Sequence, residues 1–200
     1  MERSHFLQLV KKQTTAISLI AQEAAQVHEN VNQTYDKTLP YAFHLRMAAS
    51  YVTRFGHLIL KTEDHLDTLY AAIYFHDALE DARLSYNDLK KTFERLNTLG
   101  CNIQTEIAVE AVYALTNDKG RTRSERAGEN YYQGIRATPY APFLKMCDRL
   151  ANIRYATLFA EENRMATIYR EEMKHFLTSI GDVPQEMKKE AECYFAEFER

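Results

Sequence analysis

Apolar residues recur at three- and four-residue spacing along almost the whole 200-residue chain, the pattern of helices that each bury one face. The chain has only six glycines and four prolines, and no stretch alternates apolar and polar residues as a half-buried strand does. Helices are therefore predicted at residues 5–32, 41–56, 64–82, 86–98, 103–116, 123–136, 141–161, 163–180 and 184–199. The predicted fold class is all-α, a helical bundle.

The chain contains no internal repeat, low-complexity tract or linker, so one domain over residues 1–200 is predicted. Hydrophobic residues make up 46% of the sequence and charged residues 26%, a balance that fills a sizeable core. Pro40 and Pro184 are each expected in the first turn of a helix, where the missing N–H costs nothing. Ser85 and Asp88 have the spacing of a capping box.

Charge, cysteine and hydropathy patterns exclude several classes of protein. The net charge of -3 provides no broad basic surface, so a DNA or RNA duplex is not an expected partner. The three cysteines are far apart and form no CxxC pair, which argues against a disulfide framework or a thiolate zinc site. No apolar stretch approaches the ~20 residues of a membrane span, and no signal-peptide layout is present. A cytoplasmic location is expected.

The predicted helix at 64–82 departs from the amphipathic pattern. From Leu69 to Phe75 it is apolar on nearly every side, so it is expected to be buried. Four ionisable residues follow directly: His76, Asp77, Glu80 and Asp81. Burying such groups costs several kcal/mol for each unpaired ion, so a compensating charge is needed.

A divalent cation would compensate these charges. In a continuous helix His76 and Glu80 would share one face, and Asp77 and Asp81 a neighbouring face. The first pair would then bind the cation, and the second would point at whatever the cation activates. The alternative is a solvated helix end with Glu80 and Asp81 at the surface.

Two distant segments offer further ligands. His44 lies one turn into the helix predicted at 41–56, where a histidine can also be a simple core residue. Asp148 lies inside an apolar helical run, with Lys145 one turn before it and Asn152 one turn after it. An aspartate in such a place is commonly paired with a neighbouring basic residue. Together with the first segment, they would provide two imidazoles and two carboxylates, which suit manganese, iron or zinc.

The order of His44, His76-Asp77 and Asp148 resembles the H…HD…D pattern of the HD superfamily of metal-dependent phosphohydrolases. The segment His76-Asp-Ala-Leu-Glu-Asp81 is similar to the HDxxED motif of the RelA/SpoT hydrolase domains and the small alarmone hydrolases. Lys145-Met-Cys-Asp-Arg-Leu-Ala-Asn-Ile-Arg154 is similar to their K-L-A-D-R-L-x-N-x-R, and His28 followed by Pro40-Tyr-x-x-His44 resembles their opening helix and loop. The resemblance covers about residues 24–158, with helices in 163–199 expected to pack on this core.

This resemblance implies a pyrophosphohydrolase that removes the 3′-diphosphate from guanosine tetra- or pentaphosphate. It implies one divalent metal ion, Mn²⁺ first and Fe²⁺, Zn²⁺ or Mg²⁺ as alternatives, and a small nucleotide substrate. By position the implied metal ligands are His44, His76, Asp77 and Asp148. The implied catalytic pair, which orients and deprotonates the attacking water, is Glu80 and Asp81. The resemblance also implies that Asn152 lines the nucleotide pocket.

A phosphate substrate also needs fixed positive charge. Lys145, Arg121 and Arg123 are the candidates, the two arginines in the densest basic stretch of the chain, which can equally be a solvated loop. The related hydrolases carry a basic pair before the Pro-Tyr motif that packs on guanine, whereas here Lys37 is the basic residue of that segment. Tyr155 stands where threonine or aspartate is common. The catalytic half of the pattern is thus matched and the base-recognition half is not.

Two alternatives to an alarmone hydrolase stay open from the sequence, and a third class is disfavoured. Binuclear HD phosphodiesterases are disfavoured, because they need further histidines and none occurs between His76 and Asp148. A single-metal nucleotidase that acts on another nucleotide uses the same four ligands. A nucleotide-sensing module without catalysis would keep the fold but need not bind metal. The sequence does not indicate an oligomeric state.

Overall fold

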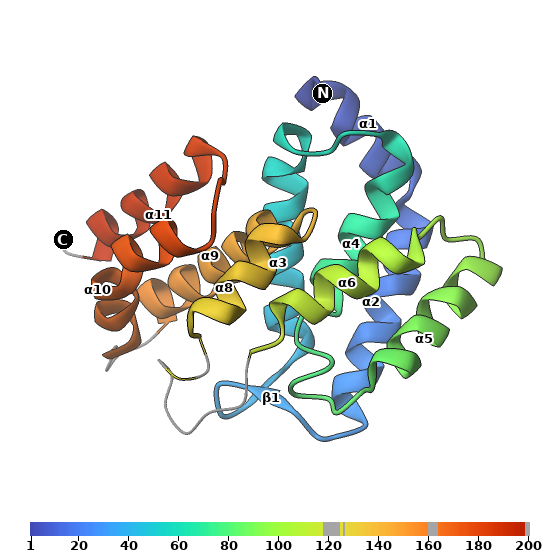
Figure 1. Ribbon diagram of the computed structural model, residues 1–200, viewed down its shortest axis with the longest axis horizontal. Coiled ribbons are helices and arrows are strands. Elements are labelled where there is room, and N and C mark those ends of the chain that lie inside the picture. The colour runs from blue at the N-terminus through green and yellow to red at the C-terminus, as the bar shows by residue number, and fades with distance from the viewer. Residues whose placement is uncertain (118–124, 126, 160–163, 199–200) are drawn as a thin grey trace.

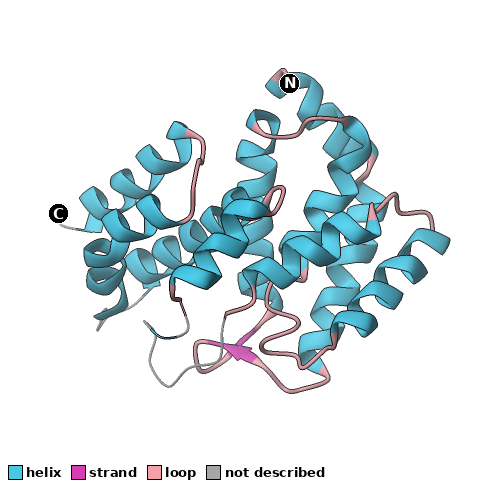
Figure 2. Cartoon of the chain, in the orientation of Figure 1, coloured by secondary structure: helices cyan, strands magenta, loops and turns pink. Residues whose placement is uncertain are grey.

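The computed structural model describes residues 1–117, 125, 127–159 and 164–198, and these residues are built almost entirely from α-helices (Figure 2). The elements in chain order are α1 (Arg3–Lys12), α2 (Thr14–Glu29), β1 (Thr34–Tyr35), β2 (Leu39–Pro40), α3 (Ala42–Phe55), η1 (Gly56–Leu58), η2 (Glu63–His65), α4 (Leu66–Tyr74), α5 (Tyr86–Thr98), α6 (Thr105–Leu115), α8 (Glu129–Ala137), α9 (Ala141–Phe159), α10 (Arg164–Ser179) and α11 (Gln185–Phe198). The prediction of an all-α bundle is confirmed.

Helix α4 forms the centre of the bundle. It packs against α2, α3, α6 and α9, and every one of its residues is buried, as its apolar sequence predicts. Helices α10 and α11 pack on α9 at one end of the molecule, and α2 and α5 lie at the other end (Figure 1). No helix in the described part of the chain is long and apolar enough to cross a membrane.

The helix predicted at 5–32 is two helices, because the chain breaks at Gln13 between α1 and α2. The hydroxyl of Thr14 donates to the carbonyl oxygen of Lys11 at 2.8 Å. Such a bond from a threonine to the preceding backbone competes with helix continuation. Helix α2 then ends at Glu29, earlier than predicted, and Asn32 follows in the left-handed conformation with φ 55°.

A short antiparallel hairpin lies between α2 and α3, in a stretch where no strand was predicted. Its register pairs Thr34 with Pro40 and Tyr35 with Leu39. The expectation that Pro40 opens a helix is wrong, because Pro40 belongs to β2 and α3 begins at Ala42. The hairpin brings residues from before α3 back over its first turn.

The helix predicted at 64–82 ends at Tyr74, and residues 75–81 form turns instead. The carbonyl oxygen of Ile73 would accept from the amide of Asp77 if the helix continued. It accepts instead from the His76 ring, whose Nδ1 lies 2.7 Å away. The HD dipeptide therefore does not stand on a helix, and the expectation of two shared helical faces was wrong.

The remaining boundaries are close to prediction, with one exception. The helix predicted at 123–136 is not continuous: Glu125 is helical, Gly128 has extended backbone and forms the N-cap of α8, and α8 begins at Glu129. The predicted capping box of α5 is confirmed: the Ser85 hydroxyl accepts from the amide of Asp88, and the Asp88 carboxylate accepts from the amide of Ser85. This box fixes where the chain re-enters a helix after the turns at 75–81.

Asp67, at the start of α4, holds the connection between α5 and α6. Its side chain is buried, and its Oδ2 accepts from the amide of Asn102 at 2.8 Å. The neighbouring Thr68 hydroxyl accepts from the amide of Gln104, also at 2.8 Å. Burial raises the pKa of the Asp67 carboxyl above its ordinary value. Ionised Asp67 therefore stabilises this connection at an electrostatic cost.

We expect Asp67→Ala to lower the free energy of unfolding by about 1–3 kcal/mol, because the hydrogen bond that the buried Asp67 carboxylate accepts from the backbone amide of Asn102 is lost. Asp67→Asn keeps an acceptor and removes the buried charge, so it is expected to be the more stable of the two variants. Because the raised pKa favours the neutral acid in the folded state, wild type loses stability relative to Asp67→Asn as the pH rises above about 4. Urea denaturation at pH 4 and pH 7 checks both expectations, and an Asn variant no more stable than Ala would contradict them.

Candidate metal centre

Three separate elements bring the four expected ligands together. His44 comes from the first turns of α3, His76 and Asp77 from the turn after α4, and Asp148 from the middle of α9. The Nε2 atoms of His44 and His76 lie 3.2 Å apart. Nε2 of His76 is 2.9 Å from Oδ2 of Asp77, and Nε2 of His44 is 3.3 Å from Oδ1 of Asp148. Both histidines and Asp148 are buried.

The donor atoms fit a divalent cation. In His76, Nδ1 donates to the backbone at Ile73, so in the neutral ring Nε2 carries the lone pair and is directed at the cluster. Donor atoms of His44, His76 and Asp77 all lie within 4.8 Å of one another. Two imidazole nitrogens and carboxylate oxygens form the mixed set that borderline divalent metals prefer.

Without a cation, the same residues compensate one another by proton binding. Burial alone would lower the pKa of His76, but Asp77 and Asp148 outweigh it and raise that pKa to about 10. Burial would likewise raise the pKa of Asp77, and the charged His76 lowers it below its ordinary value. A protonated imidazole thus occupies the electrostatic role that a bound cation would take.

Lys145 and Asn152 flank Asp148 on α9, one turn to either side. The Nζ of Lys145 lies 3.1 Å from Oδ2 of Asp148 and 5.7 Å from the ring centroid of Tyr131. The amide nitrogen of Asn152 donates to Oδ1 of Asp148 at 2.6 Å. The pairing of Asp148 with Lys145 that the sequence left open is therefore present, in addition to the contact with the two histidines.

The acidic pair Glu80 and Asp81 is held by different partners. Glu80 accepts hydrogen bonds from both the backbone and the side-chain amide of Asn117, the latter at 3.0 Å. Asp81 accepts from the side-chain amide of Gln33 at 2.7 Å and from the hydroxyl of Tyr41 at 3.3 Å. Burial, and next the nearby charge of Asp77, raise the pKa of Asp81 above its ordinary value.

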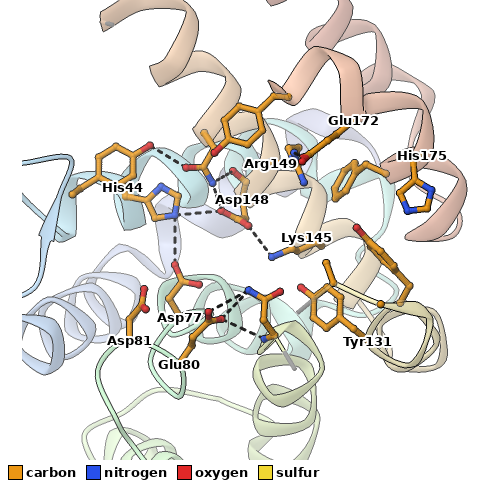
Figure 3. Close-up of a pocket in the computed structure, with 18 of the residues that line it drawn as sticks. His44, Asp77, Glu80, Asp81, Tyr131, Lys145, Asp148, Arg149, Glu172 and His175 are labelled. Carbon is orange, nitrogen blue, oxygen red and sulfur yellow. Dashed lines mark hydrogen bonds and ion pairs between the residues drawn. The ribbon is translucent and has the colours of Figure 1, made fainter. Parts of the chain in front are cut away.

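A cavity of about 940 Å³ opens beside this cluster (Figure 3). Lys145 points into it between Asp148 and Tyr131, and Asp77, Glu80 and Asp81 lie on the opposite side (Figure 3). The lining residues from α8, α9 and α10 are Glu129, Tyr131, Tyr132, Lys145, Asp148, Arg149, Asn152, Tyr169, Glu172, His175 and Phe176. Helix α10, which packs on α9, thus provides part of one wall of the cavity.

Of the described residues expected to bind substrate, one is not brought to this cavity. Lys37 is exposed in the turn of the β1–β2 hairpin and does not line the cavity. Arg121 and Arg123 lie outside the described residues. Lys145 and Asn152 do line it.

Several residues around the cluster were not predicted from the sequence. Tyr41 donates through its hydroxyl to the carboxylate of Asp77, and His28 stacks on Tyr41 with ring centroids 4.4 Å apart. Nδ1 of His28 in turn contacts the side-chain oxygen of Gln33. Tyrosine and amide side chains commonly serve only in packing, so their residue types did not indicate a role at the cluster. The sequence signal for His28 and Tyr41 was the similarity of His28 and the Pro-Tyr motif to the alarmone hydrolases.

Comparison with known proteins gives one informative match. No family model matches the chain. The chain is 35% identical over 129 residues to the guanosine-3′,5′-bis(diphosphate) 3′-pyrophosphohydrolase of Aquifex aeolicus, and this match covers 62% of the chain. The match spans only 16% of the length of that relative. The similarity supports the resemblance that the motifs indicate, at modest identity.

The raised pKa of His76 predicts how the metal-free protein responds to pH. The charged imidazole stabilises the fold fully below the ordinary pKa of 6.5, and this contribution is lost as the pH rises through about 10. We expect the free energy of unfolding of chelator-treated wild type to fall over this range more steeply than that of His76→Gln. Urea denaturation at pH 6.5, 8 and 10 measures the difference, and parallel curves for the two proteins would show that His76 is not the responsible group.

Proposed function

We propose that this protein is a metal-dependent phosphohydrolase that hydrolyses a nucleotide pyrophosphate such as guanosine 3′,5′-bis(diphosphate) at its 3′-diphosphate. The observation that carries the proposal is the convergence of His44, His76, Asp77 and Asp148 beside a large cavity. The similarity to a pyrophosphohydrolase supports the choice of substrate. The same four residues are the proposed ligands of one divalent ion, Mn²⁺ in the first instance.

The proposed chemistry divides between the cation and the protein. A bound divalent cation supplies Lewis-acid stabilisation of the negative charge on the attacked phosphate and lowers the pKa of the attacking water. The protein supplies a proton acceptor, and Glu80 or Asp81 takes this role in the proposal. A positioned general base contributes roughly 10²–10⁴-fold to the rate.

The surroundings of the two carboxylates suggest different roles for them. Asp81 is tied to Gln33 and Tyr41 beside the proposed ligand Asp77. Both carboxylates line the cavity, but among the described residues Glu80 has hydrogen bonds only with Asn117. We therefore assign proton acceptance to Glu80 and orientation of the water to Asp81.

Other cavity residues would bind the remainder of the substrate. A cavity of about 940 Å³ lies in the range that encloses a whole small-molecule ligand. Lys145 presents its ammonium group at the cavity side of Asp148 and is the proposed contact for a phosphate oxygen. The tyrosines of α8 and α10 offer aromatic surface for a base or ribose, in place of the basic pair that is absent before Pro40.

We expect Glu80→Gln to reduce turnover by about 10²–10⁴-fold, because the amide cannot accept a proton, while the bound metal content stays unchanged. Glu110→Gln is the matched control, because Glu110 is an exposed carboxylate on α6 whose described partner is the hydroxyl of Tyr86. Steady-state kinetics and metal analysis on both variants provide the test. Wild-type turnover in Glu80→Gln would remove Glu80 from the mechanism.

The substrate is tested by incubating purified protein with a panel of nucleotides, with Mn²⁺ and with chelator. We expect pyrophosphate from guanosine tetraphosphate with Mn²⁺ and none with chelator. Phosphate from nucleoside monophosphates would indicate a single-metal nucleotidase instead. No product from any nucleotide, together with no bound metal, would favour a nucleotide-sensing module.

A further inference from the structure

The two histidines of the cluster are oriented in different ways. A metal-binding histidine usually donates its second ring N–H to a carbonyl or carboxylate, which fixes the ring. His76 does so, because its Nδ1 lies 2.7 Å from the carbonyl oxygen of Ile73. Nδ1 of His44 is buried and has no hydrogen-bond partner among the described residues. On its Nδ1 side, the His44 ring is therefore held by packing.

Tyr35 provides this packing. Its ring stacks on the His44 ring with centroids 4.8 Å apart and planes inclined by only 14°. Tyr41 contacts the same imidazole edge-on, with centroids 5.5 Å apart. A stacked ring on one face and an edge on another restrict rotation of the imidazole, as a hydrogen bond at Nδ1 otherwise would.

The hydroxyl of Tyr35 reaches a second proposed ligand. It donates to the side-chain oxygen of Asn152 at 3.0 Å. Since that oxygen accepts from Tyr35, the amide nitrogen of Asn152 is directed at Asp148, and it donates to Oδ1 at 2.6 Å. Oδ1 is the carboxylate oxygen that also faces the Nε2 atoms of both histidines.

Tyr35 is itself held firmly. Its strand pairs with β2, opposite Leu39. The ring of Tyr155 packs edge-on against it, with centroids 4.8 Å apart, and the Tyr155 hydroxyl donates to the carboxylate of Asp36 at 2.8 Å. The hairpin and α9 therefore fix Tyr35 from two sides.

We propose that Tyr35 is a positioning residue of the metal centre, which orients His44 through its ring and Asp148 through its hydroxyl and Asn152. This inference rests on the proposed metal site. It gives the β1–β2 hairpin a role in metal affinity, although no hairpin residue is among the proposed ligands.

The test measures metal binding directly, without turnover. Mn²⁺ affinity is determined by electron paramagnetic resonance of the free ion, and ligand geometry by the visible absorption spectrum of Co²⁺ bound to the same protein. Tyr35→Phe keeps the stacked ring and loses the hydroxyl, so we expect Mn²⁺ affinity to fall about two- to tenfold. Tyr35→Leu loses both contacts, and we expect a fall of about 10–100-fold and a changed Co²⁺ spectrum.

Tyr86→Phe is the matched control, because it removes a tyrosine hydroxyl that binds the exposed Glu110 on α6 rather than a hairpin residue or a residue next to a proposed ligand. We expect its Mn²⁺ affinity and Co²⁺ spectrum to match the wild type. Tyr35→Phe carries the test even if Tyr35→Leu does not fold. Equal affinities in Tyr35→Phe, Tyr86→Phe and wild type would overturn the inference and leave the proposed function intact. A wild-type protein that binds no divalent metal would overturn both.

Discussion

The attraction between buried opposite charges is the interaction on which the site depends. Asp148 meets His44, His76 and Lys145 within a small volume, and Asp77 meets both histidines. Each of these groups would be costly to bury alone, and each lowers the cost for the others. This pairing of opposite charges is also compatible with metal binding. A cation can replace the proton on His76, and both Asp77 and Asp148 would then still face a positive charge.

The irregular segments of the chain place this charge where it can act. The end of α4 at Tyr74 releases residues 75–81 from helical geometry, so that Glu80 and Asp81 turn toward different partners, Asn117 and Gln33. In a continuous helix the two side chains would project from adjoining faces of the same helix. The hairpin before α3 has a comparable effect, since it brings aromatic side chains over the imidazole of His44.

Much of the fold and the set of clustered residues were accessible from the sequence, for a physical reason. Helical periodicity is a local property of the sequence. An ionisable residue inside an apolar run, such as Asp148, is recognisable because burying its charge costs free energy unless a partner compensates it. The end of α4 was not accessible, because it depends on a bond between the His76 ring and its own backbone that apolar spacing does not encode. The contacts of Tyr35 and Asn117 were missed since they join residues distant in sequence through ordinary tyrosine and amide side chains. The positions of Arg121 and Arg123 lie outside the described residues, and the roles given to the individual site residues stay predictions.

The distribution of the cluster over α3, the turn after α4, and α9 has a consequence for the order of events during folding. None of these three segments alone contains the four proposed ligands, and Asp148 is far along the chain from His44. The complete donor set exists only after α9 has docked against α3 and α4. Metal capture is therefore expected late in folding, as a step that locks a tertiary structure already formed rather than one that nucleates it.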